Sequence, residues 1–253
     1  MRASLVDTSR WQGTVNVQAM ADAGFAGIVA RCTIGWAGLD LPGNSLYKDV
    51  QAQARAIPGF LFGAYHLLWA SNRDPRREAI WYLQQRGDVD FNVLDVELDD
   101  RTKPNQGFPN LAGVQAQAKI WLDEVSRATQ QKTVCYTGSW FWTAPAGWES
   151  QYDLWEAEYT VSIPRGGIDR SLQPEAPKQP KTTGWTAAKL WQWTSGGKPI
   201  GVTSQSLDYN VFMDGDVSAL RSYLGLAPPP VPLEQRVSIL EREAAARGWN
   251  LAP

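Results

Sequence analysis

The chain reads FNVLDVE from Phe91 to Glu97, near its middle. Side chains alternate between the two faces of a β-strand, so Asp95 and Glu97 share one face while Leu94 and Val96 share the other. The apolar face predicts a covering layer of helices. The two carboxylates then point inward at the end of the strand, an arrangement typical of the mouth of a β/α barrel.

Other strand-like apolar segments flank this one, with helical stretches between them. We expect them at Ala3–Val6, Gly27–Cys32, Phe60–Tyr65, Thr133–Tyr136, Leu154–Tyr159, Lys189–Thr194 and in a short piece near Leu207. Alternation of strands and helices predicts parallel strands joined by crossover helices. The eight candidates together predict an α/β fold, a single irregular, TIM-like β/α barrel.

Two of the intervening helices have clear signals. Asp74 followed by Pro75 predicts an N-cap and the first residue of a helix. A second helix is expected from about Leu111 to Ala128, where residues such as Val114 and Val125 recur at helical spacing and form an apolar stripe. Both helices are expected to cover the barrel wall.

The domain boundaries follow from composition. Residues 1–226 are expected to form the barrel domain, and the Pro-rich residues 227–232 predict an extended linker. Residues 233–253 predict a short helix. Apolar residues at heptad spacing make weak self-association through 233–247 one interpretation, and a frayed tail or a helix lying on the barrel the other. The segment Ser162–Thr183 is long and rich in Pro and Lys, so it is interpreted as an insertion beside the cleft.

Composition excludes several functions. A net charge of −2 and no cluster of Lys and Arg disfavour nucleic-acid binding. No apolar stretch is long enough to cross a bilayer, and the first residues lack the apolar region of a signal peptide, so synthesis in the cytoplasm is expected. Cys32 and Cys135 lack metal-ligand spacing and are expected to be buried thiols. With His66 as its single histidine, the chain is expected to bind no metal or cofactor.

Carboxylates are therefore the candidate catalysts. Two close acids can divide the work of glycoside hydrolysis, one protonating the leaving oxygen and the other stabilising positive charge at the anomeric carbon. Asp95 and Glu97 suit this role, although either could instead cap the next element or bind a cation. Asp7 ends the first expected strand, and Asp208 could meet it if the barrel closes; a helix N-cap is the alternative for Asp208.

The chain contains 13 tryptophans, which either fill the core or form platforms for sugar rings. For any single tryptophan, core filling is the expected role.

These residues together resemble glycoside hydrolase family 25, the Chalaropsis-type lysozymes, over roughly residues 4 to 215. The segments similar to the family's motifs are Asp7–Gly13, Ile28–Arg31 with Gly35 and Asp40, Gly63–His66, Leu94–Glu97, Tyr136–Gly138, Trp155–Tyr159, Leu190–Thr194 and Leu207–Asn210. They follow one another in the family's order.

The resemblance implies hydrolysis of the β-1,4 bond between N-acetylmuramic acid and N-acetylglucosamine in bacterial peptidoglycan, without a cofactor. It implies that Glu97 is the general acid/base, that Asp95 assists the 2-acetamido group, and that Asp7 and Asp208 flank them. The residues implied to line the substrate groove are Tyr65, Tyr136, Trp155, Tyr159, Trp191 and Arg31. Glu156 and Glu158 depart from the expected pattern, because they would repel an anionic sugar unless they face outward.

Two other functions are open. One is a non-catalytic or weakly active wall-binding module of a phage tail or secretion device, which the four intact acids disfavour. The other is hydrolysis of a different N-acetylated glycan such as chitin, for which the D-x-x-D-x-D-x-E strand is absent. We expect an endolysin-like enzyme that acts on the cell wall after lysis or dedicated export.

Overall fold

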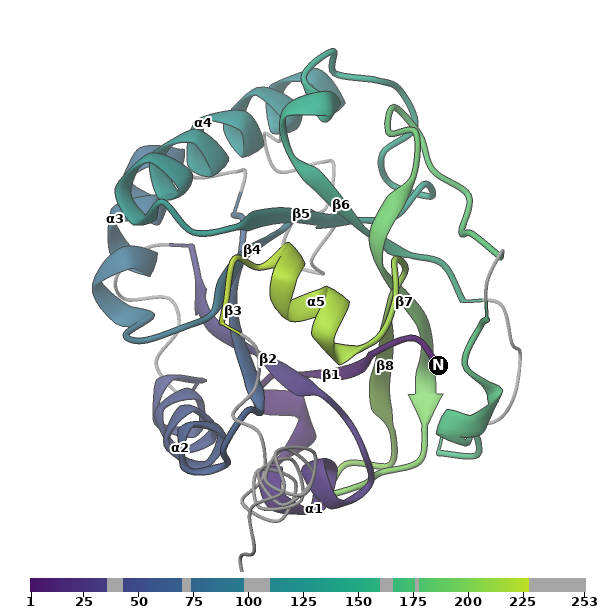
Figure 1. Cartoon of the computed structure of the whole chain (residues 1–253). Coiled ribbons are helices and arrows are strands. Elements are labelled where there is room, and N and C mark those ends of the chain that lie inside the picture. Colours follow the sequence, from purple (N-terminus) through teal and green to yellow (C-terminus); the bar gives the residue numbers. More distant parts are fainter. Residues whose placement is uncertain (36–42, 70–73, 98–109, 160–165, 176–177, 228–253) are drawn as a thin grey trace, which may run out of the picture.

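Eight strands close into a barrel in the computed structural model, which describes residues 1–35, 43–69, 74–97, 110–159, 166–175 and 178–227 (Figure 1). The strands are β1 (Ser4–Thr8), β2 (Gly27–Ile34), β3 (Leu61–Leu67), β4 (Phe91–Asp95), β5 (Thr133–Thr137), β6 (Asp153–Ala157), β7 (Ala188–Gly197) and β8 (Leu207–Phe212). The expected barrel is confirmed, and each expected strand overlaps an observed one.

The expectation that all strands are parallel is wrong for the last one. Strands β1 to β7 are parallel neighbours, whereas β8 runs antiparallel to both β7 and β1. The connection 198–206 is too short for the crossover of about a dozen or more residues that a parallel pair requires. As a result β8 begins at the end of the barrel where the parallel strands finish.

Helices cover one part of the barrel wall more completely than the other. The helices α1 (Val17–Asp22), α2 (Gly43–Ala56), α3 (Pro75–Gln85) and α4 (Leu111–Thr129) surround β1 to β5 (Figure 1). Between β5 and β7 the described connections contain only the short 3-10 helices η4 (Glu149–Gln151) and η5 (Arg170–Leu172). This asymmetry makes the barrel irregular, as expected.

The sequence signals for α3 and α4 are confirmed. Asp74 caps α3, its side chain accepting a hydrogen bond from the Arg77 amide, and Pro75 is the first helical residue. Helix α4 ends one residue beyond the expected boundary, where Gln130 adopts a left-handed conformation. None of the described helices is long and apolar enough to cross a membrane.

Side-chain alternation divides the apolar residues into two cores. Phe91 and Val93 of β4 face the barrel interior. Leu94 and Val96 face outward and belong to the same cluster as Trp121 of α4. Strand β4 therefore has one face inside the barrel and one beneath the helices, as its sequence predicts.

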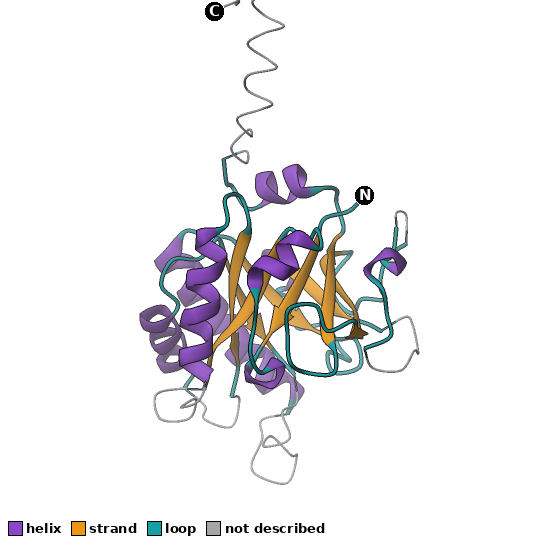
Figure 2. Cartoon of the chain, turned by 90° about the horizontal axis from the view of Figure 1, so that it is seen from below, coloured by secondary structure: helices purple, strands orange, loops and turns teal. Residues whose placement is uncertain are grey.

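Helix α5 (Val217–Tyr223) closes the end of the barrel opposite the carboxyl ends of the parallel strands (Figures 1 and 2). Leu220 and Leu224 are buried against the inner core, and the Tyr223 ring lies 5.2 Å from that of Phe212. Apart from Ala227, the expected linker and terminal helix, residues 227–253, lie outside the described residues.

Most of the described tryptophans fill the core. The buried ones are Trp121, Trp142, Trp148, Trp155, Trp191 and Trp193. The expected burial of both thiols is also confirmed, since Cys32 and Cys135 are free and buried. Burial raises the pKa of Cys135 well above its usual range.

The single histidine lies behind the barrel wall. His66 Nε2 and Glu78 Oε2 are 2.9 Å apart, and both side chains are fully buried between β3 and α3. His66 Nδ1 lies 2.7 Å from the Thr33 hydroxyl, and its ring stacks on Trp121. His66 therefore joins β3 to the helices that cover it.

Candidate active site

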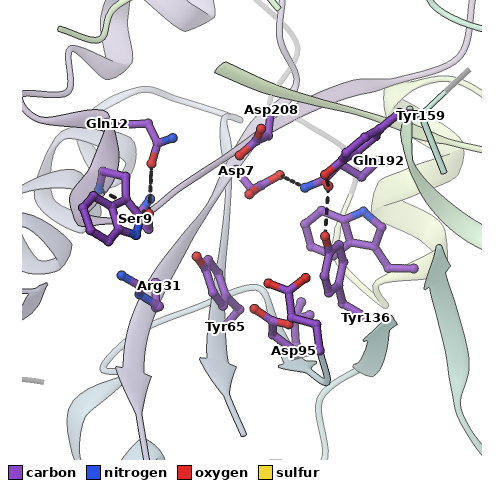
Figure 3. Close-up of a pocket in the computed structure, with 14 residues that line it drawn as sticks. Asp7, Ser9, Gln12, Arg31, Tyr65, Asp95, Tyr136, Tyr159, Gln192 and Asp208 are labelled. Atoms are coloured by element: carbon purple, nitrogen blue, oxygen red, sulfur yellow. Dashed lines mark hydrogen bonds between the residues drawn. The ribbon is translucent and has the colours of Figure 1, made fainter. Parts of the chain in front are cut away.

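A pocket of about 230 Å³ opens at the carboxyl ends of the parallel strands (Figure 3). It is lined by Asp7, Ser9, Trp11, Gln12, Arg31, Tyr65, Val93, Asp95, Glu97, Tyr136, Trp155, Tyr159, Gln192 and Asp208. The structure thus brings together all four carboxylates singled out from the sequence. It also brings together five of the six residues expected to line the groove.

Strand β4 carries Asp95 and directs Glu97 to the same side. The backbone stays anchored beyond Asp95, because the Val96 amide donates to the Tyr136 carbonyl at 2.9 Å and the Val96 carbonyl accepts from the Thr137 hydroxyl at 2.8 Å. Asp95 is buried at the base of the pocket, whereas Glu97 is half-buried. The anchored backbone explains how a residue just past the strand keeps the inward orientation that strand alternation predicts.

Asp7 and Asp208 face each other across the seam that closes the barrel. They are register partners in the antiparallel pair of β1 and β8, which places their side chains on one face as close neighbours. Asp208 lies within a strand and not before a helix, so it is not an N-cap. Figure 3 shows Asp7 and Asp208 on one side of the pocket and Asp95 on the opposite side, with Tyr65 beside them.

The surroundings of Asp7 change the pKa of its carboxyl group. Burial raises the pKa of Asp7 to about 6, even though hydrogen bonds from Asn210 and Gln192 lower it. Both amide groups donate to Asp7 Oδ2 at 2.8 Å. Asp7 therefore exchanges its proton near neutral pH.

Gln192 organises the aromatic side of the pocket. Its Oε1 accepts hydrogen bonds from the hydroxyls of Tyr136 and Tyr159, each at 2.9 Å, while its Nε2 donates to Asp7. Trp155 packs edge-on against Tyr136 with ring centroids 5.3 Å apart. The aromatic side chains are thus held in fixed positions relative to Asp7.

The loop after β1 forms one rim of the pocket. Ser9 accepts a hydrogen bond from the Trp11 amide, and the Ser9 amide donates to Gln12 Oε1 at 2.7 Å, which fixes the short helix η1 (Arg10–Gln12). The Thr203 amide donates to the Gln12 carbonyl and fastens this loop to the β7–β8 connection. Trp11 is 68% exposed and presents its ring at the rim.

The electrostatic potential of the pocket is negative, because acidic side chains outnumber the single arginine among its described lining residues. Burial raises the pKa of Tyr65 well above its usual range; Arg31 lowers it, and the charges of Asp7, Asp95 and Glu97 raise it further. These three carboxylates therefore surround one tyrosine. Such a site can donate a proton and stabilise positive charge on a bound molecule, the requirements of glycosidic bond cleavage.

The sequence matches the family model described as "Glycosyl hydrolases family 25" over residues 6–202. The chain belongs to glycosyl hydrolase family 25. It is therefore a glycoside hydrolase, and the family resemblance deduced from the motifs is confirmed.

Relatives of this family 25 member include proteins named as lysozymes and others named as uncharacterised. "Uncharacterized protein YegX" of Escherichia coli O157:H7 is 28% identical over 229 residues, covering 87% of this chain and 72% of the relative. "Lysozyme M1" of Streptomyces globisporus is 24% identical over 221 residues, covering 82% and 66%. A bacterial lysozyme from Streptomyces coelicolor has a TM-score of 0.69 at 19% identity, covering 88% of this chain and 97% of its own. A GH25 lysozyme from Aspergillus fumigatus has a TM-score of 0.68 at 22% identity, covering 88% and 99%.

One expected groove residue lies elsewhere. Trp191 is fully buried in the outer core, and its indole N–H donates to the Glu158 carbonyl at 2.8 Å. Alternation along β7 turns Trp191 and Trp193 outward and directs Gln192 into the pocket. A fully buried ring cannot serve as a platform for a sugar, so the placement of Trp191 in the groove is corrected.

The two additional acids near Trp155 do not line the pocket. Glu156 is buried behind β6, where it accepts a hydrogen bond from the Ser139 amide, and burial raises its pKa to about 7. Glu158 accepts from the Lys181 amide. Neither side chain contributes to the wall that a substrate would meet.

The long segment between β6 and β7 was interpreted as an insertion beside the cleft. Its described residues, 166–175 and 178–183, contribute nothing to the pocket lining. Gln173 instead donates to the Arg2 carbonyl, and Arg2 donates to the Lys178 carbonyl. This part of the segment packs beside the beginning of β1, away from the pocket.

Sequence reasoning missed Gln192 and Asn210. Both lie in segments that were singled out for their neighbours. Alternation from the inward Asp208 identifies Asn210, whereas Gln192 was missed because Trp191 was expected to point inward. Gln192 stands between two outward tryptophans, and Asn210 is two residues beyond the inward Asp208.

Across the described residues, no group of three or more His, Cys, Asp or Glu side chains is arranged to hold a metal ion.

Proposed function

We propose that this family 25 hydrolase is a muramidase that cleaves the β-1,4 bond between N-acetylmuramic acid and N-acetylglucosamine in peptidoglycan. The observation that carries the proposal is the convergence of Asp95, Glu97, Asp7 and Asp208 on one pocket with aromatic walls. The relatives named lysozymes support the choice of substrate.

Glu97 acts as the general acid. It lies just beyond the end of β4 and is half-buried at the pocket wall, which suits a group that must reach the glycosidic oxygen and later exchange a proton with water. Asp95, deeper in the pocket, supplies negative charge that orients the 2-acetamido group and stabilises positive charge near the anomeric carbon.

Asp7, Asp208 and the aromatic residues hold the sugar. The amides of Gln192 and Asn210 keep Asp7 in place as an acceptor for a sugar hydroxyl. Tyr65 and Tyr159 line the pocket, and Trp155, which also lines it, packs edge-on against Tyr136.

The enzyme is proposed to act on the bacterial cell wall. Solved structures similar to this chain include one described as the CTP1L endolysin and one described as a spore cortex lytic enzyme. The route from the cytoplasm to the wall, by lysis or dedicated export, stays a prediction.

The division of labour is tested with Glu97→Gln and Asp95→Asn. Each should reduce lysis of purified walls by about 10²-fold or more, because removing a general acid costs about 10²- to 10⁴-fold. An aryl glycoside with a good leaving group needs little protonation, so it should partly rescue Glu97→Gln. Asp95→Asn should gain much less, because stabilisation of positive charge is still missing.

Glu158→Gln is the matched control, since it removes a nearby carboxylate that does not line the pocket. It should lyse walls at the wild-type rate. Equal rescue of the two active-site variants would contradict the assigned roles. Release of sugars from chitin, without any loss of wall turbidity, would contradict the proposed substrate.

A further inference from the structure

Arg31 is the only cationic side chain among the described residues that line the pocket, where it faces four carboxylates. It lies on β2 as the register partner of Tyr65, and its side chain shares the inner face with Val29. Figure 3 shows Arg31 and Tyr136 on opposite sides of the pocket, with Tyr65 between them.

The guanidinium of Arg31 makes no hydrogen bond or ion pair with a protein group in the part of the chain that the structure describes. Other arginines differ: Arg55 pairs with Asp90, and Arg76 pairs with Glu124. A half-buried guanidinium with free donors is suited to receive a carboxylate or carbonyl oxygen from a ligand.

The chemistry of the glycan narrows the choice of ligand group. N-acetylglucosamine and N-acetylmuramic acid differ only in the 3-O-lactyl group of the latter. That group ends in a carboxylate in peptide-free strands and in an amide carbonyl where the peptide stem is attached. The ionised carboxylates of the pocket repel an anionic group, and among the described lining residues Arg31 is the cation that attracts one.

We propose that Arg31 binds the lactyl group of N-acetylmuramic acid and thereby makes the enzyme prefer this sugar to N-acetylglucosamine. The proposal rests on the muramidase function proposed above. In peptide-free strands the planar guanidinium donates two hydrogen bonds to the lactyl carboxylate; in peptide-bearing strands it donates to the lactyl carbonyl oxygen. Binding at the β2 side also sets the direction in which the strand crosses the pocket.

The test is a double-mutant cycle that pairs Arg31→Gln with removal of the lactyl carbonyl. The protein background is Glu97→Gln, which prevents turnover. One ligand is the peptide-free tetrasaccharide of alternating N-acetylglucosamine and N-acetylmuramic acid, and the other is the same molecule with its lactyl carboxyls reduced to alcohols. Titration calorimetry gives the Kd for each combination of protein variant and ligand.

With Arg31 present, the acid should bind roughly 10- to 100-fold more tightly than the alcohol, the range for a hydrogen bond to a charged group. In Arg31→Gln the two ligands should bind within about threefold of each other. Arg31→Lys keeps the charge but loses the planar pair of donors, so its preference should be intermediate. Arg10→Gln removes an exposed cation over Trp11 and should leave the preference unchanged.

Persistence of the preference in Arg31→Gln, or an equal loss of affinity for both ligands, overturns the proposal. Thermal melting of each variant shows whether it is folded, and Arg31→Lys decides the matter if Arg31→Gln is not. Absence of wall lysis by the wild-type enzyme would instead overturn the muramidase function, so the two failures are distinguishable.

Discussion

At the scale of single residues, Asp7 shows how neighbours set the properties of a functional group. Burial disfavours its charged form, and two amide donors only partly compensate. At a pH below this pKa, Asp7 is protonated, and the folded protein avoids the free-energy cost of burying a charged carboxylate. Above its pKa the protein retains that charge and is less stable for it.

We predict that Asp7→Asn stabilises the protein more at pH 7 than at pH 4. The folded state holds the Asp7 proton up to a pKa of about 6, against an ordinary value of 3.8, so the wild type loses stability as pH rises through this interval. At about 1.4 kcal/mol per pKa unit, the difference between variant and wild type should grow by up to about 3 kcal/mol. Urea unfolding at both pH values measures it.

Asp22→Asn, which removes an exposed carboxylate of α1, should show no such growth. A constant difference between Asp7→Asn and wild type across this range would contradict the prediction. Wall lysis by Asp7→Asn should fall at the same time, so stability and activity change in opposite directions.

At the scale of elements, Glu78 attaches α3 to the barrel wall. Its carboxylate meets His66 of β3 and accepts a hydrogen bond from the Trp69 amide just beyond that strand. Tyr82, one turn further along α3, donates to the Ala64 carbonyl and to Asn92 of β4. These polar contacts fix the helix over the two strands that carry Tyr65 and Asp95.

We predict that Glu78→Ala lowers the free energy of unfolding by about 3–5 kcal/mol, because it leaves buried partners without their acceptor. Glu78→Gln should cost much less, since its amide oxygen still accepts from Trp69. Urea denaturation followed by tryptophan fluorescence gives both values. A loss under about 1 kcal/mol for Glu78→Ala would show that the contact contributes little to stability.

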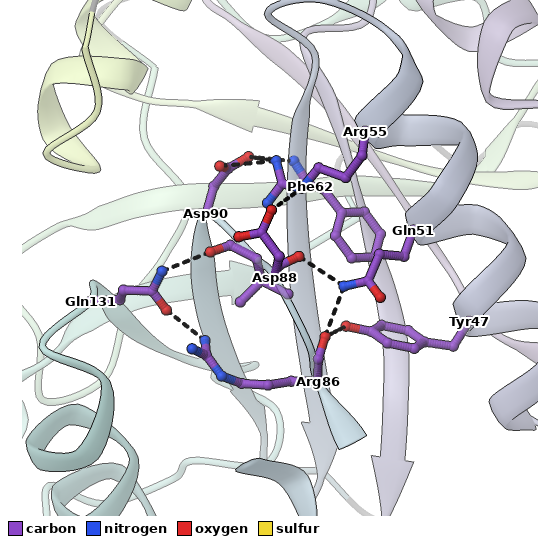
Figure 4. Close-up of polar contacts among 9 residues, drawn as sticks. Tyr47, Gln51, Arg55, Phe62, Arg86, Asp88, Asp90 and Gln131 are labelled. Carbon is purple, nitrogen blue, oxygen red and sulfur yellow. Dashed lines mark hydrogen bonds and ion pairs between the residues drawn. The ribbon is translucent and has the colours of Figure 1, made fainter. Parts of the chain in front are cut away.

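At the scale of the whole molecule, the two ends of the barrel have different roles. The pocket occupies one end, and α5 with a polar network occupies the other. In that network Arg55 of α2 pairs with Asp90 at 3.0 Å, Asp90 accepts from the Phe62 amide, and Gln51 donates to the Arg86 carbonyl (Figure 4). Such contacts at the amino ends of barrel strands stabilise the fold and leave the opposite end to chemistry.

We predict that truncation after Ala227 leaves a folded, active enzyme. Within the described residues, the inner core ends with Leu220 of α5 and Leu224 just after it, both buried, and Leu226 packs against this core. Circular dichroism and thermal melting should match the full chain, and wall lysis should be retained. Truncation after Asp216 removes α5 and both leucines, each worth about 2–5 kcal/mol, so it should fail to fold. Unfolding of the longer truncation would show that residues beyond 227 belong to the core.

The sequence by itself determined what depends on local periodicity. Alternation along β4 put Asp95 and Glu97 on the inner face, and Asp74 with Pro75 marked the start of α3, because these signals act over a few neighbouring residues. The number of strands, and hence the barrel, followed from repeating such segments.

Only the tertiary structure decided which residues meet. The short connection 198–206 excludes a parallel crossover to β8, but the pairing of Asp208 with Asp7 depends on how the barrel closes between strands far apart in sequence. The pKa of Asp7 likewise depends on burial and on amides from β7 and β8, far away in sequence. Trp191 was misplaced because its motif marks a strand end, whereas the face it occupies is set by the register of the closed barrel.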